Sequence, residues 1–344
     1  MLRNRRSRVR ALAAVLVCAA LVCVAVALGT FLGSARIPPG DVLAALLRRS
    51  GGWQETVVWS IRLPRALLGL MVGGGLALAG ATLQGLFRNP LADPGILGVS
   101  SGASLGAVLV ITLGLSAHAV WLLPVAAFAG AVLTALLVFV IAARRGRGRI
   151  FTGTLLLVGI AVSALNVSLV TFVLSLSLDN YEVGRQVMYW LLGGLEGRTW
   201  DHVLLGAPAV VVGAAVVIAH ARSLDALLLG EIGAQSVGVD LPRVRLILTV
   251  ATSLIVGASV AVAGPVGFVG LLIPHIVRLA VGPGHRVLMP LSFFLGGVFV
   301  SFADLVARTV LAPGEIPVGV VTAAVGAPIF LALLVRRGGE VAAS

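Results

Sequence analysis

Long apolar runs alternate with short polar segments along almost the whole chain. A helix needs about 20 predominantly apolar residues to cross a bilayer, and a surface that faces lipid must itself be apolar. We predict ten spanning helices, at residues 11–33, 62–86, 95–115, 119–142, 152–174, 202–221, 245–263, 267–281, 287–310 and 317–335. The pattern therefore predicts an all-α polytopic membrane protein, with residues 1–344 forming a single transmembrane domain.

Two parts of this pattern contain prolines and glycines that should interrupt or end helices. The eighth run is short, lies between two Gly-Pro pairs, and contains Pro274, which is expected to kink or partly break its helix. In the stretch "NPLADPGILGVSSGASLGA", residues 89–107, proline and aspartate favour a turn after the second span. The glycines and serines that follow are expected to begin the third helix with a small, mildly polar face.

Composition supports membrane burial. The 344 residues are 59% hydrophobic and 11% charged, with a mean hydropathy of +1.10, whereas soluble proteins have about 25% charged residues. The net charge of +12 comes from arginines that cluster between apolar runs, as in cytoplasmic loops beside anionic lipid. We therefore expect contact with lipid rather than nucleic acid, and both termini in the cytoplasm.

The N-terminal arginines and the apolar run after them resemble a signal peptide. That run, from Ala11 to Phe31, is longer than a signal h-region, so an uncleaved first span is the preferred interpretation and cleavage near Ala27 the alternative. Cys18 and Cys23 lie inside this run. They are expected to pack in the membrane, with no disulfide and no metal site.

Several enzyme motifs are missing. A P-loop needs a lysine to reach phosphate, and the chain contains none, nor HExxH or CxxC. The sequence predicts no covalently bound cofactor and no ATP hydrolysis by the P-loop route. Two overlapping GxSxG matches contain Ser100, Ser101 and Ser104, but a serine hydrolase needs a strand–turn–helix elbow with histidine and acidic partners. An intramembrane hydrolase is the less favoured alternative.

Asp304 is the clear ionisable residue within the apolar runs, with Arg308 one helical turn later. A charge inside a span is expected to be functional and to have a partner, and the spacing allows an intrahelical pair. An ion-coupled secondary transporter, the rival from another class, would require more coupling carboxylates than this one.

The segment 222–245 is the most informative polar loop. It is too long for a simple turn, and its leucines and small residues suggest short helices. Such an amphipathic segment suits a groove on another protein, or it lies flat on the membrane. On the opposite side of the membrane, "MYWLLGGLEG" at residues 188–197 suggests a short interfacial helix.

Three blocks resemble a known family. They are "RLPRALLGLMVGGGLALAGATLQGLFRNPLADPGILGVSSGASLGA" (62–107), "GPVGFVGLLIPHIVRLAVGPGHRVLMP" (264–290) and "ADLVARTVLAPGEIPVGVVTAAVGAPIFLALL" (303–334). They are similar to the permease subunits of ABC importers for iron chelates and cobalamin. The resemblance implies a type II ABC importer permease architecture in a bacterial cytoplasmic (inner) membrane. It also implies four partners: a second copy of the chain, two ATP-binding subunits that use ATP inside, and a substrate-binding protein outside.

The resemblance also assigns roles to residues. The segment 222–245 becomes the cytoplasmic loop that couples to the ATPase, and its expected coupling residues are Leu224, Leu228, Gly230, Glu231, Ala234 and Gly238. Arg62, Arg65 and Arg308 match positions that pair with glutamates of the binding protein; contact with lipid headgroups is the alternative.

The remaining assignments concern the translocation path and its cargo. Ser100, Ser101 and Ser104 are expected along the path, and Thr152 and Gly153 near an inner gate. The cargo expected first is an iron chelate, a siderophore or haem. Cobalamin is the alternative, because "MYWLLGG" is similar to the cobalamin permease at that position.

Overall fold

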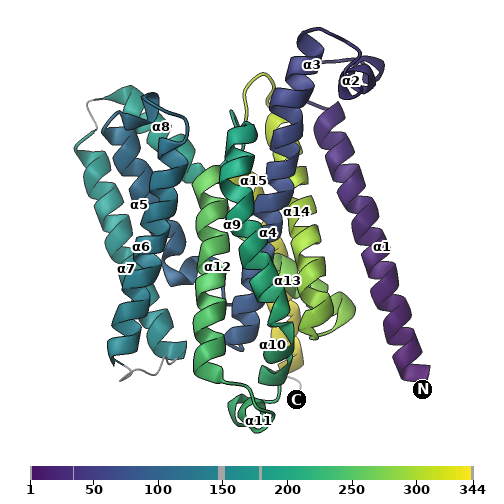
Figure 1. Cartoon of the computed structure of the whole chain (residues 1–344), viewed down its shortest axis with the longest axis vertical. Helices are drawn as coiled ribbons and strands as arrows, with labels where there is room; N and C mark the ends of the chain where they lie inside the picture. The colour runs from purple at the N-terminus through teal and green to yellow at the C-terminus, as the bar shows by residue number, and fades with distance from the viewer. Residues whose placement is uncertain (1, 34, 146–151, 178–179, 342–344) are drawn as a thin grey trace.

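The computed structural model describes residues 2–33, 35–145, 152–177 and 180–341. Within these ranges the regular structure is entirely helical, and the long helices run roughly side by side (Figure 1). Ten of them correspond to the ten predicted spans: α1 (Leu2–Phe31), α4 (Leu63–Leu86), α5 (Val99–Thr112), α6 (Leu122–Arg145), α7 (Thr152–Ser175), α9 (Trp200–Ala219), α12 (Leu241–Ala263), α13 (Val269–Val281), α14 (His285–Thr309) and α15 (Val318–Val341). In the described part of the chain, seven helices are long and apolar enough to cross a membrane, and three shorter apolar ones accompany them.

Helix α4 is the centre of the bundle. Of its most apolar stretch, 89% is buried, whereas α1, α6, α7 and α9 bury only 22–28% of theirs. Helix α14 packs along α4 more extensively than any other pair of described elements. Glycines permit this approach: a Cβ at Gly73 would overlap the backbone of Gly296 on α14. Small residues at helix contacts in lipid allow such close packing.

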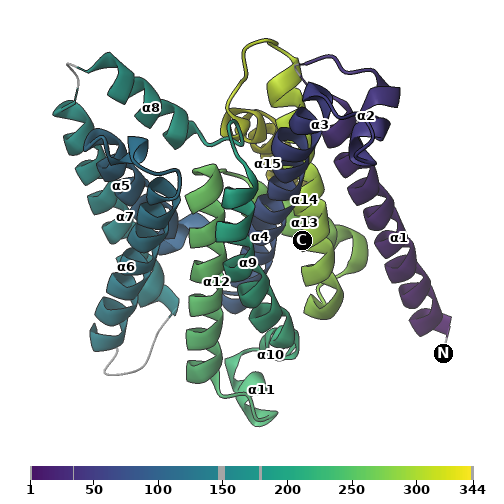
Figure 2. The same ribbon diagram turned by 45° about the horizontal axis from the view of Figure 1, so that its top comes forward.

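The helices form two groups that α12 joins. Figure 2 shows α5, α6 and α7 together on one side, while α4, α13, α14 and α15 lie on the other and α1 forms the far edge. Helix α12 packs against α6 of the first group, against α4 of the second, and against α9.

Short helices cap both ends of the bundle. At one end, called the α8 end, lie α2 (Pro39–Leu46), α3 (Trp53–Val57), the π-helical turn η1 (Val58–Arg62) and α8 (Tyr181–Leu192). At the other, called the α11 end, α10 (Ala221–Leu227) and α11 (Glu231–Ser236) project beyond the long helices (Figure 1). Two 3₁₀ turns, η2 (Pro94–Leu97) and η3 (Leu115–Ala117), flank α5.

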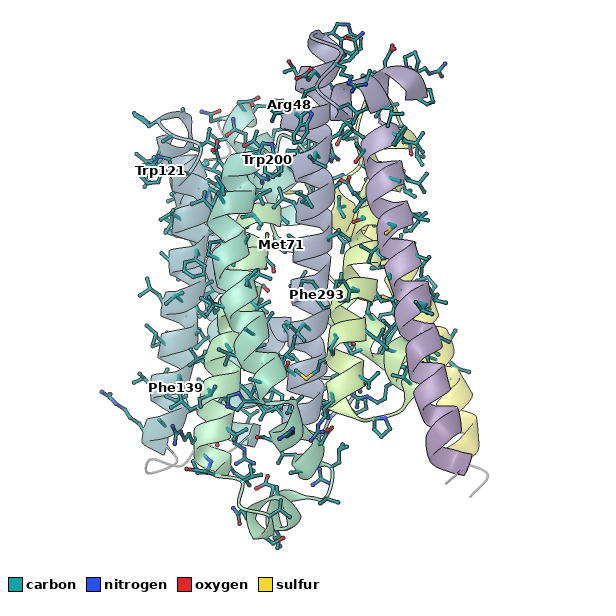
Figure 3. All side chains as sticks on the ribbon, turned by 45° about the vertical axis from the view of Figure 1, so that its right-hand side comes forward. Arg48, Met71, Trp121, Phe139, Trp200 and Phe293 are labelled. Atoms are coloured by element: carbon teal, nitrogen blue, oxygen red, sulfur yellow. The ribbon has the colours of Figure 1, made fainter. Side chains whose placement is uncertain are left out.

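Tryptophans gather at the α8 end. Figure 3 places Trp121, Trp200 and Arg48 there. The indole of Trp200 donates to the carbonyl of Trp59 at 2.7 Å, and the Arg48 guanidinium lies 4.6 Å from the Trp59 ring centre. Such an aromatic belt is typical of the boundary between membrane and water, so it marks the level at which the helices leave the bilayer.

Three local expectations need correction. The second predicted span begins earlier, because α3 and η1 continue into α4 and give one apolar stretch over Trp53–Leu86. Pro274 lies inside the continuous helix α13, so the expected break is absent. The interfacial helix also begins earlier than expected, at Tyr181, where Asn180 caps it, and it ends at Leu192 before the glycines of its motif.

Candidate functional site

The protruding segment between α9 and α12 consists of α10, α11 and the turns around them. Two glycines shape it: Gly230 (φ 94°) precedes α11 and Gly238 (φ 86°) follows it. These left-handed conformations strain residues with a Cβ. The short helices expected within 222–245 are therefore present as α10 and α11, and the turns around α11 require glycine.

The segment is fastened to the bundle through its buried side. Leu224 and Ala234 have no exposed surface, so they anchor the segment. Asp225 accepts hydrogen bonds from the backbone N–H of His285 (2.6 Å) and pairs with its ring Nδ1 (3.0 Å) at the start of α14. Glu231 pairs with Arg245 on α12. A displacement of the segment would thus be passed to both α12 and α14.

The outward side of the segment is apolar. Ile232 is 85% exposed and Leu229 70%, and Leu228 and Val237 are exposed as well. Side chains of this kind on a protruding helix are the anchors that a hydrophobic groove on another protein recognises. Of the expected coupling residues, Leu228 and Glu231 face outward, whereas Leu224 and Ala234 face the bundle.

A buried ionic cluster lies at the α8 end. The Arg65 guanidinium on α4 donates to Asp304 on α14 at 2.8 Å and to Glu315 at 2.7 Å. Arg308 lies 3.6 Å from Asp304, as the spacing of the two residues suggested, and donates to the carbonyl of Gly29 on α1. The cluster therefore joins α1, α4, α14 and the segment before α15.

Sequence reasoning missed the main partner of Asp304. It considered Arg308, one turn away, but the closer partner is Arg65 on another helix. The need for a partner was visible, because an uncompensated charge in a span is costly. No sequence pattern indicated that Glu315 would join the same cluster, because its position depends on the folded path of the chain.

The three arginines expected to meet a binding protein are buried in the isolated chain. Their exposed fractions are 3% for Arg62, 6% for Arg65 and 4% for Arg308. Arg62 donates to the carbonyls of Thr30, Phe31 and Ala35. Their docking role stays a prediction, and it would require these internal bonds to be exchanged for bonds to a partner.

The serines expected along the path belong to a polar contact among α5, α6 and α7. Asn166 donates to Ser101 (3.2 Å) and to Thr134 (3.1 Å), and Ser104 donates to the carbonyl of Ser100. Ser104 is buried, and Ser100 and Ser101 are half-buried. Their role along the path also stays a prediction.

The residues expected at an inner gate lie at the start of α7. Gly153 is exposed, with open space around its Cα, and Thr152 is the first residue of the helix, its side chain lying outside the described part. Among the described residues, no group of three or more His, Cys, Asp or Glu is placed to hold a metal ion.

A cavity of about 330 Å³ opens at the α8 end. It lies between α8, the connection 193–199, the end of α5 with η3, and the segment 315–318 that leads into α15. Arg65 and Glu315 of the ionic cluster form part of its wall. The same wall contains Arg185, Trp190 and Arg198, residues that sequence reasoning did not single out.

These features define the class of protein. Apolar helices of spanning length surround a buried centre, and a pair of short helices carries exposed apolar side chains at one end. This is a polytopic membrane protein. The sequence model of the FecCD transport family matches residues 12–336, so the chain belongs to this family of ABC importer permeases.

Named relatives agree with this assignment. The chain is 48% identical to the cobalamin import system permease protein BtuC of Halobacterium salinarum, over 82% of this chain and 74% of that protein. It is 42% identical to the vitamin B12 import system permease protein BtuC of Salmonella paratyphi A, over 92% of this chain and 93% of that protein. These relatives are permease subunits rather than enzymes, and ATP hydrolysis belongs to separate subunits.

A solved structure has the same fold. It is a metal-chelate type ABC transporter in an inward-facing conformation, with a TM-score of 0.83 and 30% identity, and the match covers 93% of this chain and 98% of that chain. The predicted architecture of a helical ABC importer permease is therefore confirmed.

Proposed function

We propose that this protein is the permease subunit of an importer that carries cobalamin into the cell. Relatives named as cobalamin or vitamin B12 permeases are 42–48% identical to it. An iron chelate, the cargo expected first from sequence, is the second candidate. The structural similarity to a metal-chelate type transporter favours it.

The proposed assembly contains two copies of the chain, two ATP-binding subunits and a substrate-binding protein, in a bacterial cytoplasmic (inner) membrane. The single observation that supports it best is the apolar outward side of α11 and its flanking turns. The ATP-binding subunits would hold this side in a groove, so the α11 end faces the cytoplasm. Helix α1 runs towards the α8 end and α15 runs away from it (Figure 1). Both termini would then lie in the cytoplasm.

The proposed mechanism is mechanical. Binding of ATP closes the two ATP-binding subunits and shifts α10 and α11 with them. Asp225 passes the shift to α14 through His285, and Glu231 passes it to α12 through Arg245. Because α14 packs along the central helix α4, the movement reaches the middle of the bundle. Such coupling requires a structural element whose conformational equilibrium is shifted both by the ATP-binding subunits and by the cargo site.

Reconstitution tests the proposal. The permease, its ATP-binding subunits and its binding protein would be placed in proteoliposomes, and uptake of labelled cobalamin, a ferric siderophore and haem would be measured with ATP inside. Cobalamin uptake alone is expected, and uptake of only an iron chelate would replace the first candidate by the second. Uptake of none of them with intact ATP hydrolysis would refute both cargoes.

A pair of variants tests the coupling surface. Ile232→Asp places a charge on the most exposed apolar side chain of the segment and should abolish co-purification of the ATP-binding subunits. Leu43→Asp is the matched control, because Leu43 is an exposed leucine at the α8 end. Equal co-purification with both variants would show that the ATP-binding subunits dock elsewhere.

A further inference from the structure

The cavity at the α8 end has a largely apolar wall that also contains three arginines and two glutamates, Glu196 and Glu315. Ile111, Leu123, Ile316 and Val318 line it together with the rings of Tyr189 and Trp190. Its volume of about 330 Å³ falls at the lower end of the range for small-molecule sites. Such a space accepts part of a large organic ligand.

Three arginines line this cavity, and they differ in their partners. Arg65 is bonded to Asp304 and Glu315, and Arg185 is bonded to Glu182 at 2.9 Å. Arg198 has no carboxylate within ion-pair distance in the described part of the chain. Its one side-chain hydrogen-bond contact with a described residue is from Nη1 to the ring Nε2 of His202, at 3.2 Å.

His202 does not compensate the charge of Arg198. An imidazole is either neutral or cationic, so its ring supplies no negative charge. Its Nδ1 faces the backbone N–H and the hydroxyl of Thr199, both at 3.3 Å. The contact with His202 therefore leaves the charge of Arg198 without a counter-ion among the described residues.

Two donors at this wall lack a hydrogen-bond partner among the described residues. Arg198 Nε and Trp190 Nε1 are both buried and unpaired, and Trp190 as a whole is only 6% exposed. An unsatisfied buried donor is costly, and a charged one more so. Two such donors on one cavity form a set that an acceptor with negative charge would satisfy.

Arg198 stays charged under physiological conditions. Burial lowers the pKa of its guanidinium to about 10, still well above neutral pH. Its planar fork matches the geometry of a carboxylate or phosphate, whose oxygens it can bind in pairs.

We propose that Arg198 and Trp190 bind an oxyanion, a carboxylate or phosphate group of the cargo, where it enters the permease at the α8 end. The apolar and aromatic wall would contact the body of the same molecule. This inference rests on the proposed function, because it assumes that the α8 end faces outward and receives cargo.

The binding test needs no cargo and no partner. The permease would be placed in nanodiscs of zwitterionic phosphatidylcholine, so that no anionic headgroup competes. Phenylglyoxal would modify its arginines, with citrate or pyrophosphate as the oxyanion probe and glycerol as the neutral one. Mass spectrometry would then compare Arg198 with Arg185, which lines the same cavity but already has an acidic partner.

The expected result is protection of Arg198 by citrate or pyrophosphate, by about tenfold as for a charged hydrogen bond, with little change at Arg185. Trp190→Phe removes one donor but keeps an aromatic ring, so it should weaken this protection. No protection of Arg198, or equal protection of both arginines, would overturn the proposal.

The transport test separates the cargo from the binding protein as the source of the oxyanion. In the complete importer, Arg198→Gln should raise the KM for cargo about tenfold and leave docking of the binding protein unchanged. Arg198→Lys should restore part of the affinity, and Arg185→Gln is the control. Weaker docking with an unchanged KM would instead assign Arg198 to a carboxylate of the binding protein and overturn the proposal. If the wild type imports none of the cargoes, the proposed function fails, and phenylglyoxal protection still decides whether the oxyanion site exists.

Discussion

Arg65 on α4 and Asp304 on α14 lie 239 positions apart in the chain, and their side chains are joined by hydrogen bonds of 2.8–3.1 Å. Both are almost fully buried. An ion pair in such surroundings is costly to break, because the partner that remains is left charged and desolvated. This pair therefore fixes how the two central helices meet at the α8 end.

Removal of Asp304 should destabilise the protein. Asp304→Ala leaves Arg65 with Glu315 alone and takes from Arg308 its nearest carboxylate. We expect a loss of about 3 kcal/mol in the free energy of unfolding, as for other broken buried pairs, measured by denaturant unfolding in detergent. Glu182→Gln breaks the exposed pair with Arg185 and should change stability little. Equal stability of the two variants would contradict a structural role of the cluster.

The contact between α4 and α13 should tolerate no added side chain at Gly80. A Cβ there would overlap the backbone of Gly270, and overpacking of this kind costs about 1–3 kcal/mol. Gly80→Ala should therefore lower the melting temperature. The control is Gly184→Ala on α8, where a Cβ meets open space and alanine is expected to be neutral or slightly stabilising. A Gly80→Ala protein that melts like the wild type would show that the helices can move apart.

Loss of the bond between Asp225 and His285 should uncouple transport from ATP hydrolysis. In Asp225→Ala, α10 keeps its buried leucines but loses its hydrogen bonds to the start of α14. The number of cargo molecules imported per ATP should fall about fivefold or more, the size of a modest coupling energy. Ser223→Ala, on the same helix, should leave the ratio unchanged. The prediction fails if Asp225→Ala lowers uptake and hydrolysis in equal proportion.

Asp93 should make stability depend on pH in the acidic range. Burial raises the pKa of its carboxyl above the ordinary 3.8, against a hydrogen bond from the backbone N–H of Gly95 that lowers it. The folded protein then holds this proton more tightly than the unfolded chain. Ionisation of Asp93 therefore lowers the free energy of unfolding at pH values above the folded-state pKa. This loss disappears as the pH falls from that pKa towards 3.8.

Two variants isolate this effect in thermal unfolding at a series of pH values. Asp93→Asn keeps an oxygen that accepts from Gly95 but cannot ionise, so it should be at least as stable as the wild type at neutral pH. Its advantage should shrink as the pH falls. Asp93→Ala loses the hydrogen bond as well and should be less stable than Asp93→Asn throughout. A constant difference in stability between the wild type and Asp93→Asn at all pH values would contradict a raised pKa of Asp93.

Much of the architecture was predictable because it depends on local composition. Each of the ten apolar runs became a helix, including the short eighth one, since a run of that length must satisfy its backbone polar groups internally in lipid. The leucines and small residues of 222–245 correctly indicated short helices. The partial break that Pro274 suggested is absent, because α13 continues through this residue as a single helix.

The sequence by itself therefore determined the number, order and approximate limits of the apolar helices, and the existence of a polar segment with short helices. Only the tertiary structure decided that Arg65 binds Asp304 and Glu315, and that Arg198 and Trp190 line one cavity without partners of their own. The physical reason is that hydrophobicity acts along each run, whereas a pairing of charges depends on where helices distant in the chain cross.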